Sequence, residues 1–216
     1  ENITITNCVL HSRDSALKIG TETHGTIRNV TLSDCIIDRC SRAVGIWVRD
    51  GGTVEDIHIH HLTGSTLRYA DRYAEPGAPG WWGKGEPIFI SATPRKNSRT
   101  KTGTIRNVTF DNLSITCESC AFLAGEPESC LRDIRIRDLH MTFKRQGTQP
   151  GGLFDEQPSV RHVYSHAIPA LYARNVKQLT VQDSTVRYAD KSEAWASEVT
   201  TLEDCTESAV DLKKIQ

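Results

Sequence analysis

The chain has 216 residues, with 26 basic and 27 acidic side chains and a formal net charge of −1. With this balance we expect neither nucleic acid nor an anionic membrane as a partner, because binding to them needs an excess of cationic side chains. No apolar run in the sequence approaches the ~18 residues that a membrane-spanning helix requires, so we expect no membrane.

A short pattern of alternating residues recurs from the first residues onward. The heptapeptide Gly-Thr-Ile-Arg-Asn-Val-Thr occurs at 25–31 and again at 103–109. Related segments begin at residues 2, 29, 56, 107, 133 and 178. The steps between these starts are 27, 27, 51, 26 and 45 residues, which indicates a unit of 26 or 27 residues with extra residues in the longer steps.

Each copy alternates apolar and polar residues, which predicts a strand with one buried face. A second apolar segment follows each copy, so further strands are expected at 16–22, 43–49, 86–94, 121–127, 168–175 and 209–215. No segment of helical length shows a 3.6-residue period. A short unit of strands buries its apolar face only by stacking on its neighbours. The sequence therefore predicts an all-β chain, a right-handed parallel β-helix that forms one domain over residues 1–216.

Equivalent positions in such a fold stack about 4.8 Å apart, the spacing of neighbouring strands. One column should therefore be interior: Cys8, Cys35, Leu62, Leu113, Leu139 and Ser184. The column just before it should lie at a turn, where small polar side chains bond the backbone: Asn7, Asp34, His61, Asn112, Asp138 and Asp183.

The long steps place insertions at 63–86, 144–167 and 185–208, each between the interior column and the next second strand. Insertions at one position of a repeat emerge on one side, so these three are expected to wall a cleft, and function is expected there. The chain starts at Glu1 inside a strand, without a cap, so we also expect further N-terminal coils before it.

The cysteine and histidine patterns predict neither a metal nor a cofactor. A zinc site built on Cys117, Cys120 and Cys130 would need a fourth ligand, and the sequence offers none at a usual spacing. A disulfide between two coils stays open as an alternative for these cysteines. Alternation along the strand puts His58 and His60 on one face, where no carboxylate completes a metal-binding set.

Several segments carry a resemblance to a known family. They are Asn-Val-Thr-Leu-Ser-Asp-Cys at 29–35, the strands at 16–22 and 42–59, and the long segments 80–95 and 150–174. Together they resemble glycoside hydrolase family 28, the polygalacturonases and rhamnogalacturonases, in a bacterial branch. The resemblance implies inverting hydrolysis of a pectin-type polysaccharide or oligosaccharide by a secreted or periplasmic protein, here expected to be a monomer.

The family's catalytic aspartates lie in an Asn-Thr-Asp motif and an Asp-Asp pair, and neither occurs in this chain. By the family's order both would precede residue 1. Where the family has Gly-His-Gly, this chain has Asp14-Ser15-Ala16, and where it has Arg-Ile-Lys, this chain has Gly45-Ile46-Trp47. These replacements point to a substrate other than plain galacturonan.

Asp14 stands at the start of the strand expected at 16–22. It is the candidate catalytic or sugar-binding carboxylate, and its alternative role is to cap a turn. Lys18 and Glu22 alternate along the same strand and either face the cleft or form a solvated pair. Arg42 and Arg49 lie on the next coil. Arg49 is a candidate to take the place of the substrate-clamping His, Arg and Lys of the resembling family, and surface charge is the alternative reading of both arginines.

Trp81 and Trp82 lie in the first insertion with Lys84 and Glu86, and aromatic rings suit the flat C–H faces of sugars. His166 and Tyr172, at the end of the second insertion, are further binding candidates. These residues complete the predicted glycan site.

Hypotheses of different class remain open at this point. The first is an inverting glycoside hydrolase, and the second is a non-catalytic glycan-binding or structural β-helix. A polysaccharide lyase is a third, although the acidic clusters that would hold its calcium are sparse in this sequence.

Overall fold

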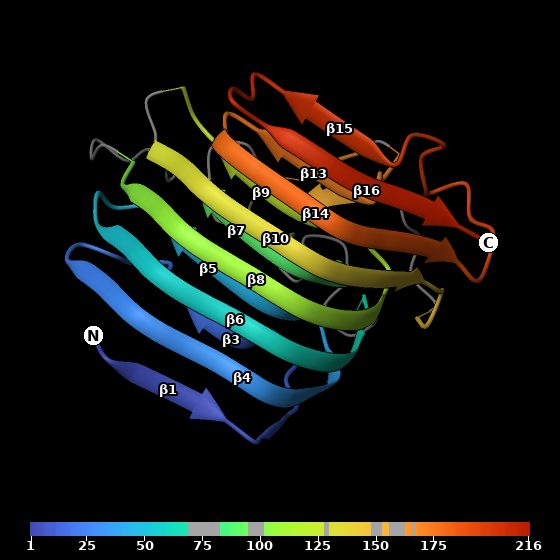
Figure 1. Ribbon diagram of the computed structural model, residues 1–216, viewed down its shortest axis with the longest axis horizontal. Coiled ribbons are helices and arrows are strands. Elements are labelled where there is room, and N and C mark those ends of the chain that lie inside the picture. Colours follow the sequence, from blue (N-terminus) through green and yellow to red (C-terminus); the bar gives the residue numbers. More distant parts are fainter. Residues whose placement is uncertain (69–82, 95–101, 128–129, 148–152, 156–162, 166) are drawn as a thin grey trace.

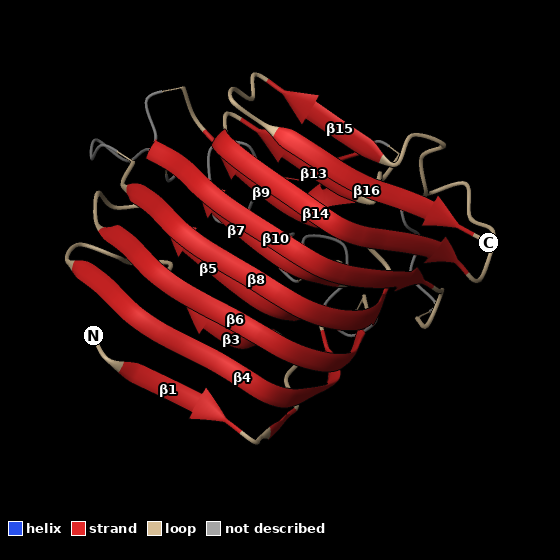
Figure 2. Cartoon of the chain, viewed as in Figure 1, coloured by secondary structure: helices blue, strands red, loops and turns tan. Residues whose placement is uncertain are grey.

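The computed structural model describes residues 1–68, 83–94, 102–127, 130–147, 153–155, 163–165 and 167–216. Within these ranges every regular element is a β-strand, as predicted (Figure 2). The same ranges offer no candidate for a helix that crosses a membrane.

The first sheet has eight strands, and all its paired neighbours run parallel. Its main path follows the order of the chain (Figure 1). The strands on this path are β1 (Ile3–Thr6), β4 (Thr26–Cys40), β6 (Thr53–Thr66), β8 (Thr104–Cys117), β10 (Cys130–Phe143), β14 (Lys177–Tyr188) and β16 (Ala209–Ile215), and β2 (Val9–Leu10) pairs with β4.

The second sheet has six parallel strands, again in chain order, so the chain alternates between the two sheets. They are β3 (Ser15–Ile19), β5 (Arg42–Val48), β7 (Glu86–Ala92), β9 (Ala121–Gly125), β13 (Leu171–Arg174) and β15 (Thr200–Glu203). A separate antiparallel hairpin joins β11 (Leu153–Asp155) to β12 (Val163–Ser165).

The register of the first sheet confirms the repeat. Thr26 pairs with Thr53, Thr53 with Thr104, and Thr104 with Cys130, so the steps read from the sequence are the steps between neighbouring strands. The predicted interior column is buried from Cys35 through Ser184, while Cys8 is half-buried at the edge of the sheet.

The predicted turn column does bend the chain, but from Asp34 onward the bends fall within continuous strands, and only Asn7 lies between two strands, β1 and β2. All six of its residues have φ between 49° and 55°. A second column with positive φ lies five residues earlier in each repeat: Asn2, Asn29, Asp56, Asn107, Asp133 and Gln178. Asn and Asp tolerate this left-handed conformation better than most residues, which explains their recurrence at both places.

The assignment of 209–215 to the second kind of strand is wrong. Ala209–Ile215 is β16 of the first sheet, and Thr200–Glu203 pairs with β13 in the second sheet instead. Period-two alternation is common to both sheets and does not distinguish them. The interval 185–208 consequently contains the end of β14 and all of β15, and 63–66 belongs to β6.

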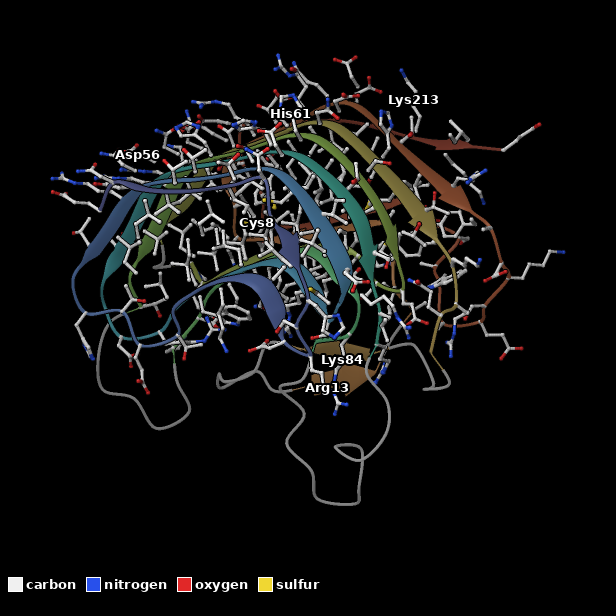
Figure 3. The ribbon with its side chains drawn as sticks, turned by 90° about the horizontal axis from the view of Figure 1, so that it is seen from below. Cys8, Arg13, Asp56, His61, Lys84 and Lys213 are labelled. Atoms are coloured by element: carbon white, nitrogen blue, oxygen red, sulfur yellow. The ribbon has the colours of Figure 1, made fainter. Side chains whose placement is uncertain are left out.

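The core lies between the two sheets, and the second sheet is also covered on its other side. Every residue of β5 and β7 is buried. Register aligns Leu17, Val44 and Ile88 on one face of the second sheet, toward the apolar interior. Figure 3 shows Cys8 between the sheets and Lys84 beyond the second sheet, on the side away from the first.

Candidate functional site

The outer face of the second sheet, which points away from the core, is where the chemistry-bearing side chains gather. Alternation and register align Lys18, Gly45, Phe89, Phe122 and Tyr172 across five neighbouring strands of this face. The three aromatic rings stack in succession, with centroids 4.9 Å apart for the first pair and 5.3 Å for the second. Parallel strands produce such a stack wherever equal positions carry flat side chains.

Gly45 and Trp47, in the segment that replaces Arg-Ile-Lys of the resembling family, pack against each other. The Trp47 ring lies over Gly45, where an added Cβ would come within 2.2 Å of the indole. The same ring lies 5.1 Å from Phe89, so Trp47 extends the aromatic stack toward β3. Its buried indole N–H has no hydrogen-bond partner among the residues that the structure describes.

Arg42 is buried at the start of β5, with 1% of its surface exposed. Its Nη1 lies 3.6 Å from Oδ1 of Asp14, and its Nε lies 3.4 Å from Oε2 of Glu86. The guanidinium also lies over the rings of Phe89 and Trp47, at 4.5 and 5.2 Å from their centroids. Two carboxylates and two aromatic faces therefore compensate a cation that has lost its water.

Asp14 and Lys18 form the exposed part of this cluster. Lys18 Nζ donates to Asp14 Oδ2 at 2.7 Å, and Ser15 Oγ donates to Asp14 Oδ1 at 3.3 Å. The cap at this bend comes from Ser12, whose Oγ accepts the backbone N–H of Asp14 at 3.0 Å. The partner of Lys18 is thus Asp14, whereas Glu22 is exposed in the loop after β3.

Arg49 does not belong to the solvent-exposed surface. It is fully buried, and its Nη1 and Nη2 donate to the backbone carbonyl and Oγ of Ser91 at 2.7 and 3.0 Å. The reading of Arg42 and Arg49 as surface charge is therefore wrong, because β5 and β7 are buried on both faces. Arg49 ties β5 to β7, and its donors point at protein atoms.

Three further predicted binding residues are also packed. Glu86 has a side chain only 3% exposed and accepts the backbone N–H of Lys84 at 2.7 Å. Lys84 is buried and forms an isolated antiparallel bridge with Arg68. Tyr172 is buried, and its hydroxyl donates to Glu203 at 2.9 Å. The remaining predicted residues, Trp81, Trp82 and His166, lie outside the described part of the chain.

Glu118 is a buried carboxylate that we did not predict as a site residue. It contacts residues of all three insertions, which we call their stems. Its Oε2 accepts the backbone N–H of Arg68 at 2.6 Å, and its Oε1 accepts those of Gln146 and Gly147 at 2.7 and 3.0 Å. Its backbone carbonyl accepts the indole N–H of Trp195 at 3.1 Å. The predicted cleft itself stays a prediction, since most of the first two insertions lies outside the described residues.

One signal in the sequence could have found Glu118. It stands between two buried cysteines, Cys117 at the end of β8 and Cys120 just before the apolar strand Ala121–Gly125. A lone carboxylate flanked by buried positions on both sides needs donors, and backbone N–H groups of nearby loops are the usual ones.

The cysteines form no metal or redox cluster in the described residues. Cys8, Cys35, Cys40, Cys117, Cys120 and Cys205 are free thiols, and the side chain of Cys130 is outside the described part. Burial raises the pKa of Cys40 to about 11 and the pKa of Cys117 and Cys120 well above the ordinary thiol value. These thiols stay protonated at neutral pH and are poor nucleophiles.

Comparisons with protein-family models, with curated proteins and with solved structures gave no match to this chain. The resemblance to family 28 therefore rests on the quoted segments, and the function is argued below from the outer face of the second sheet.

Proposed function

We propose that the chain is a right-handed parallel β-helix that binds a pectin-type polysaccharide or oligosaccharide at the exposed β3 edge of its second sheet, beside Asp14 and Lys18. In this proposal it works as the glycan-binding part of an inverting glycoside hydrolase. The observation that carries the proposal is the placement of Lys18: its Nζ lies 5.4 Å from the centroid of the Trp47 ring. Trp47 stands where the resembling family has the lysine of Arg-Ile-Lys, so a neighbouring strand supplies a cation to the same region.

The β-helix part of the proposal rests on connectivity. Both sheets are parallel, both follow chain order, and the chain passes between them once in each repeat. A chain that alternates in this way advances along one axis and forms coils. Crossovers between parallel strands are right-handed in the great majority of proteins, which supports the right-handed form.

The glycan part of the proposal rests on the chemistry of the exposed pair. The side chains of Lys18 and Asp14 are 45% and 34% exposed, so a ligand can reach both. An ammonium group can pair with a uronate carboxylate, and a carboxylate can accept hydrogen bonds from sugar hydroxyls. Trp47, at the edge of the aromatic stack, is buried, so it supports this pair by packing and does not reach a ligand itself.

Inverting hydrolysis needs two carboxylates about 6.5 to 9.5 Å apart, with room for a water molecule between them. Asp14 and Glu86 are the carboxylates on either side of Arg42, but the guanidinium fills the space between them. Glu86 is also buried, so a water and a sugar do not reach it. Asp14 therefore acts without an acid–base partner from this cluster, and we expect the 216-residue chain to turn over substrate very slowly.

The same arrangement of Arg42 favours a second candidate, a glycan-binding β-helix without catalysis. Both candidates predict binding at Asp14 and Lys18, and they differ in whether Asp14 transfers a proton. Asp14→Asn keeps the shape of the side chain and removes the proton acceptor, so its effect on residual turnover separates them.

The experiment is calorimetric titration and product analysis with pectin fragments that differ in uronate content. We expect acidic fragments to bind in the micromolar to millimolar range, with turnover below the roughly 1 to 10³ per second of ordinary enzymes. Lys18→Met should weaken binding of acidic fragments about tenfold, the effect of one charge-assisted hydrogen bond. Lys213→Met is the matched control, because Lys213 forms a similar pair with Asp211 on β16 of the first sheet.

Equal loss in Lys18→Met and Lys213→Met, or no binding by any fragment, would contradict the proposed site. Turnover at ordinary enzyme rates would contradict the conclusion that Asp14 lacks a carboxylate partner.

A further inference from the structure

A second cluster of chemistry-bearing side chains lies on the opposite side of the molecule. On the first sheet, Asp34 of β4 and His60 and His61 of β6 bring three ligand atoms within 4.8 Å of one another. The two Nδ1 atoms are 3.0 Å apart, and Nδ1 of His61 lies 3.5 Å from Oδ1 of Asp34. Figure 3 shows His61 on the outside of the first sheet and Arg13, the neighbour of Asp14 in the chain, beyond the second, so this cluster is separate from the proposed glycan site.

The backbone explains why alternation gave a different expectation. Neighbouring residues of a regular strand point to opposite faces, which pairs His60 with His58 and separates it from His61. His61 instead has φ of 53°, and this left-handed bend brings the adjacent imidazoles together with centroids 4.9 Å apart. Asp34 occupies the same column one repeat earlier, so strand stacking places its carboxylate beside His61.

We propose that Asp34, His60 and His61 bind a divalent transition-metal ion of the zinc, nickel and copper class. Imidazole nitrogen and carboxylate oxygen are ligands that these ions accept. With bonds of about 2.05 Å, nitrogens 3.0 Å apart subtend about 95° at the ion, and atoms 3.5 Å apart subtend about 115°. Both angles fall near those of tetrahedral and tetragonal sites.

The third ligand pair requires a small adjustment. Two ligands of one ion lie at most about 4.1 Å apart, so a separation of up to 4.8 Å closes with a side-chain shift under about 1 Å. The side chains of Asp34 and His61 are about half exposed, which leaves them free to rotate. The same exposure leaves room for water or another ligand at the remaining positions of the ion.

A further carboxylate beside the cluster, Asp111, is already paired with another side chain. Asp111 pairs with His60 across β6 and β8, but its two oxygens accept Nε and Nη2 of Arg137 at 2.9 and 2.6 Å. Because Arg137 neutralises Asp111 and occupies both of its oxygens, Asp111 does not serve as a ligand. The competing account of the cluster is a plain hydrogen bond between the two imidazoles, with one Nδ1 as donor.

The test is titration of the full 216-residue chain, free of any polyhistidine tag, with Zn²⁺ and Ni²⁺ separately. We expect one ion per chain and a micromolar dissociation constant. His61→Asn removes the imidazole and keeps a residue that suits the bend, as Asn112 does at the same position of the next repeat, and it should weaken binding about 10- to 100-fold. His58→Asn is the matched control, because His58 is exposed on the same strand outside the cluster, and it should change binding less than about twofold.

X-ray absorption of the bound ion distinguishes this site from the free thiols of the chain. The proposal predicts nitrogen and oxygen scattering alone, and sulfur scattering would overturn it. Absence of binding, or equal weakening in His61→Asn and His58→Asn, would also overturn it and leave the imidazole hydrogen bond as the account of the cluster.

Discussion

The two sheets differ in what their outer sides carry, although one repeat generates both. Along β4 and β6 most outward side chains are polar and exposed or half-buried, and the inward positions hold similar residues, such as Val30 opposite Ile57. Along the second sheet, neighbouring strands place Lys18, Gly45 and Phe89 at one position. The outer sides therefore differ in burial: that of β4 and β6 meets solvent, whereas that of β5 and β7 is covered.

The largest expected loss of stability on the second-sheet side follows from removing the carboxylate of Glu118. Glu118→Ala leaves three backbone N–H groups without their acceptor and should cost about 3 to 5 kcal/mol of unfolding free energy. Glu207→Ala, which removes an exposed partner of Lys177 on the first-sheet side, should cost about 0.5 kcal/mol or less. Urea unfolding of both variants measures the difference, and similar costs would show that the stems do not depend on Glu118.

A smaller effect follows from the packing of Trp47. In Gly45→Ala the new methyl group meets the indole at 2.2 Å and Ser15 Oγ at 2.8 Å, so we expect a loss of about 1 to 3 kcal/mol. Gly25→Ala, before β4, meets nothing within 4 Å and should be neutral or slightly stabilising. Thermal unfolding of the pair checks this, and a neutral Gly45→Ala would mean that the ring does not lie over β5.

The smallest predicted effect belongs to the interior that both sheets share. Burial raises the pKa of the Cys40 thiol to about 11, from an ordinary value near 9. The unfolded thiol therefore ionises first as pH rises, so stability is fully present below pH 9 and falls between pH 9 and 11. The loss should be on the order of 1 to 2 kcal/mol.

Cys40→Ala should flatten that alkaline decline in urea unfolding under reducing conditions, whatever its cost at pH 7. Tyr188, whose pKa burial raises to about 12, should add a similar decline at higher pH. An unchanged slope in Cys40→Ala would contradict the burial of this thiol.

The sequence predicted the first sheet better than the second, for a physical reason. In a strand with one solvent-exposed face, apolar residues alternate with polar ones and mark the buried positions. The burial of the column from Cys35 to Ser184 could therefore be predicted from the sequence. The middle strands of the second sheet, such as β5 and β7, are buried on both faces, so alternation said nothing of exposure and left Arg42 and Arg49 as candidates for surface charge. Their partners come from other repeats, through distances along the chain of more than 25 residues.

The candidate sites divide in the same way. Asp14 and Lys18 were predicted to lie on one strand beside the cleft, and the structure joins them in an ion pair. Glu118 and the cluster of His60 with His61 depend on backbone that bends or loops locally. A period of two cannot represent such backbone, so neither feature followed from the pattern.

The most direct test of the account is to map a bound acidic pectin fragment by backbone amide shifts in nuclear magnetic resonance. The account predicts that the shifts concentrate on Ser15–Ile19 and Arg42–Val48, the strands next to Asp14 and Lys18. Residues of the first-sheet column that includes Asp34 and His61 should not respond. Shifts centred on that column, with β3 and β5 unaffected, would contradict the claim that the second sheet carries the glycan site.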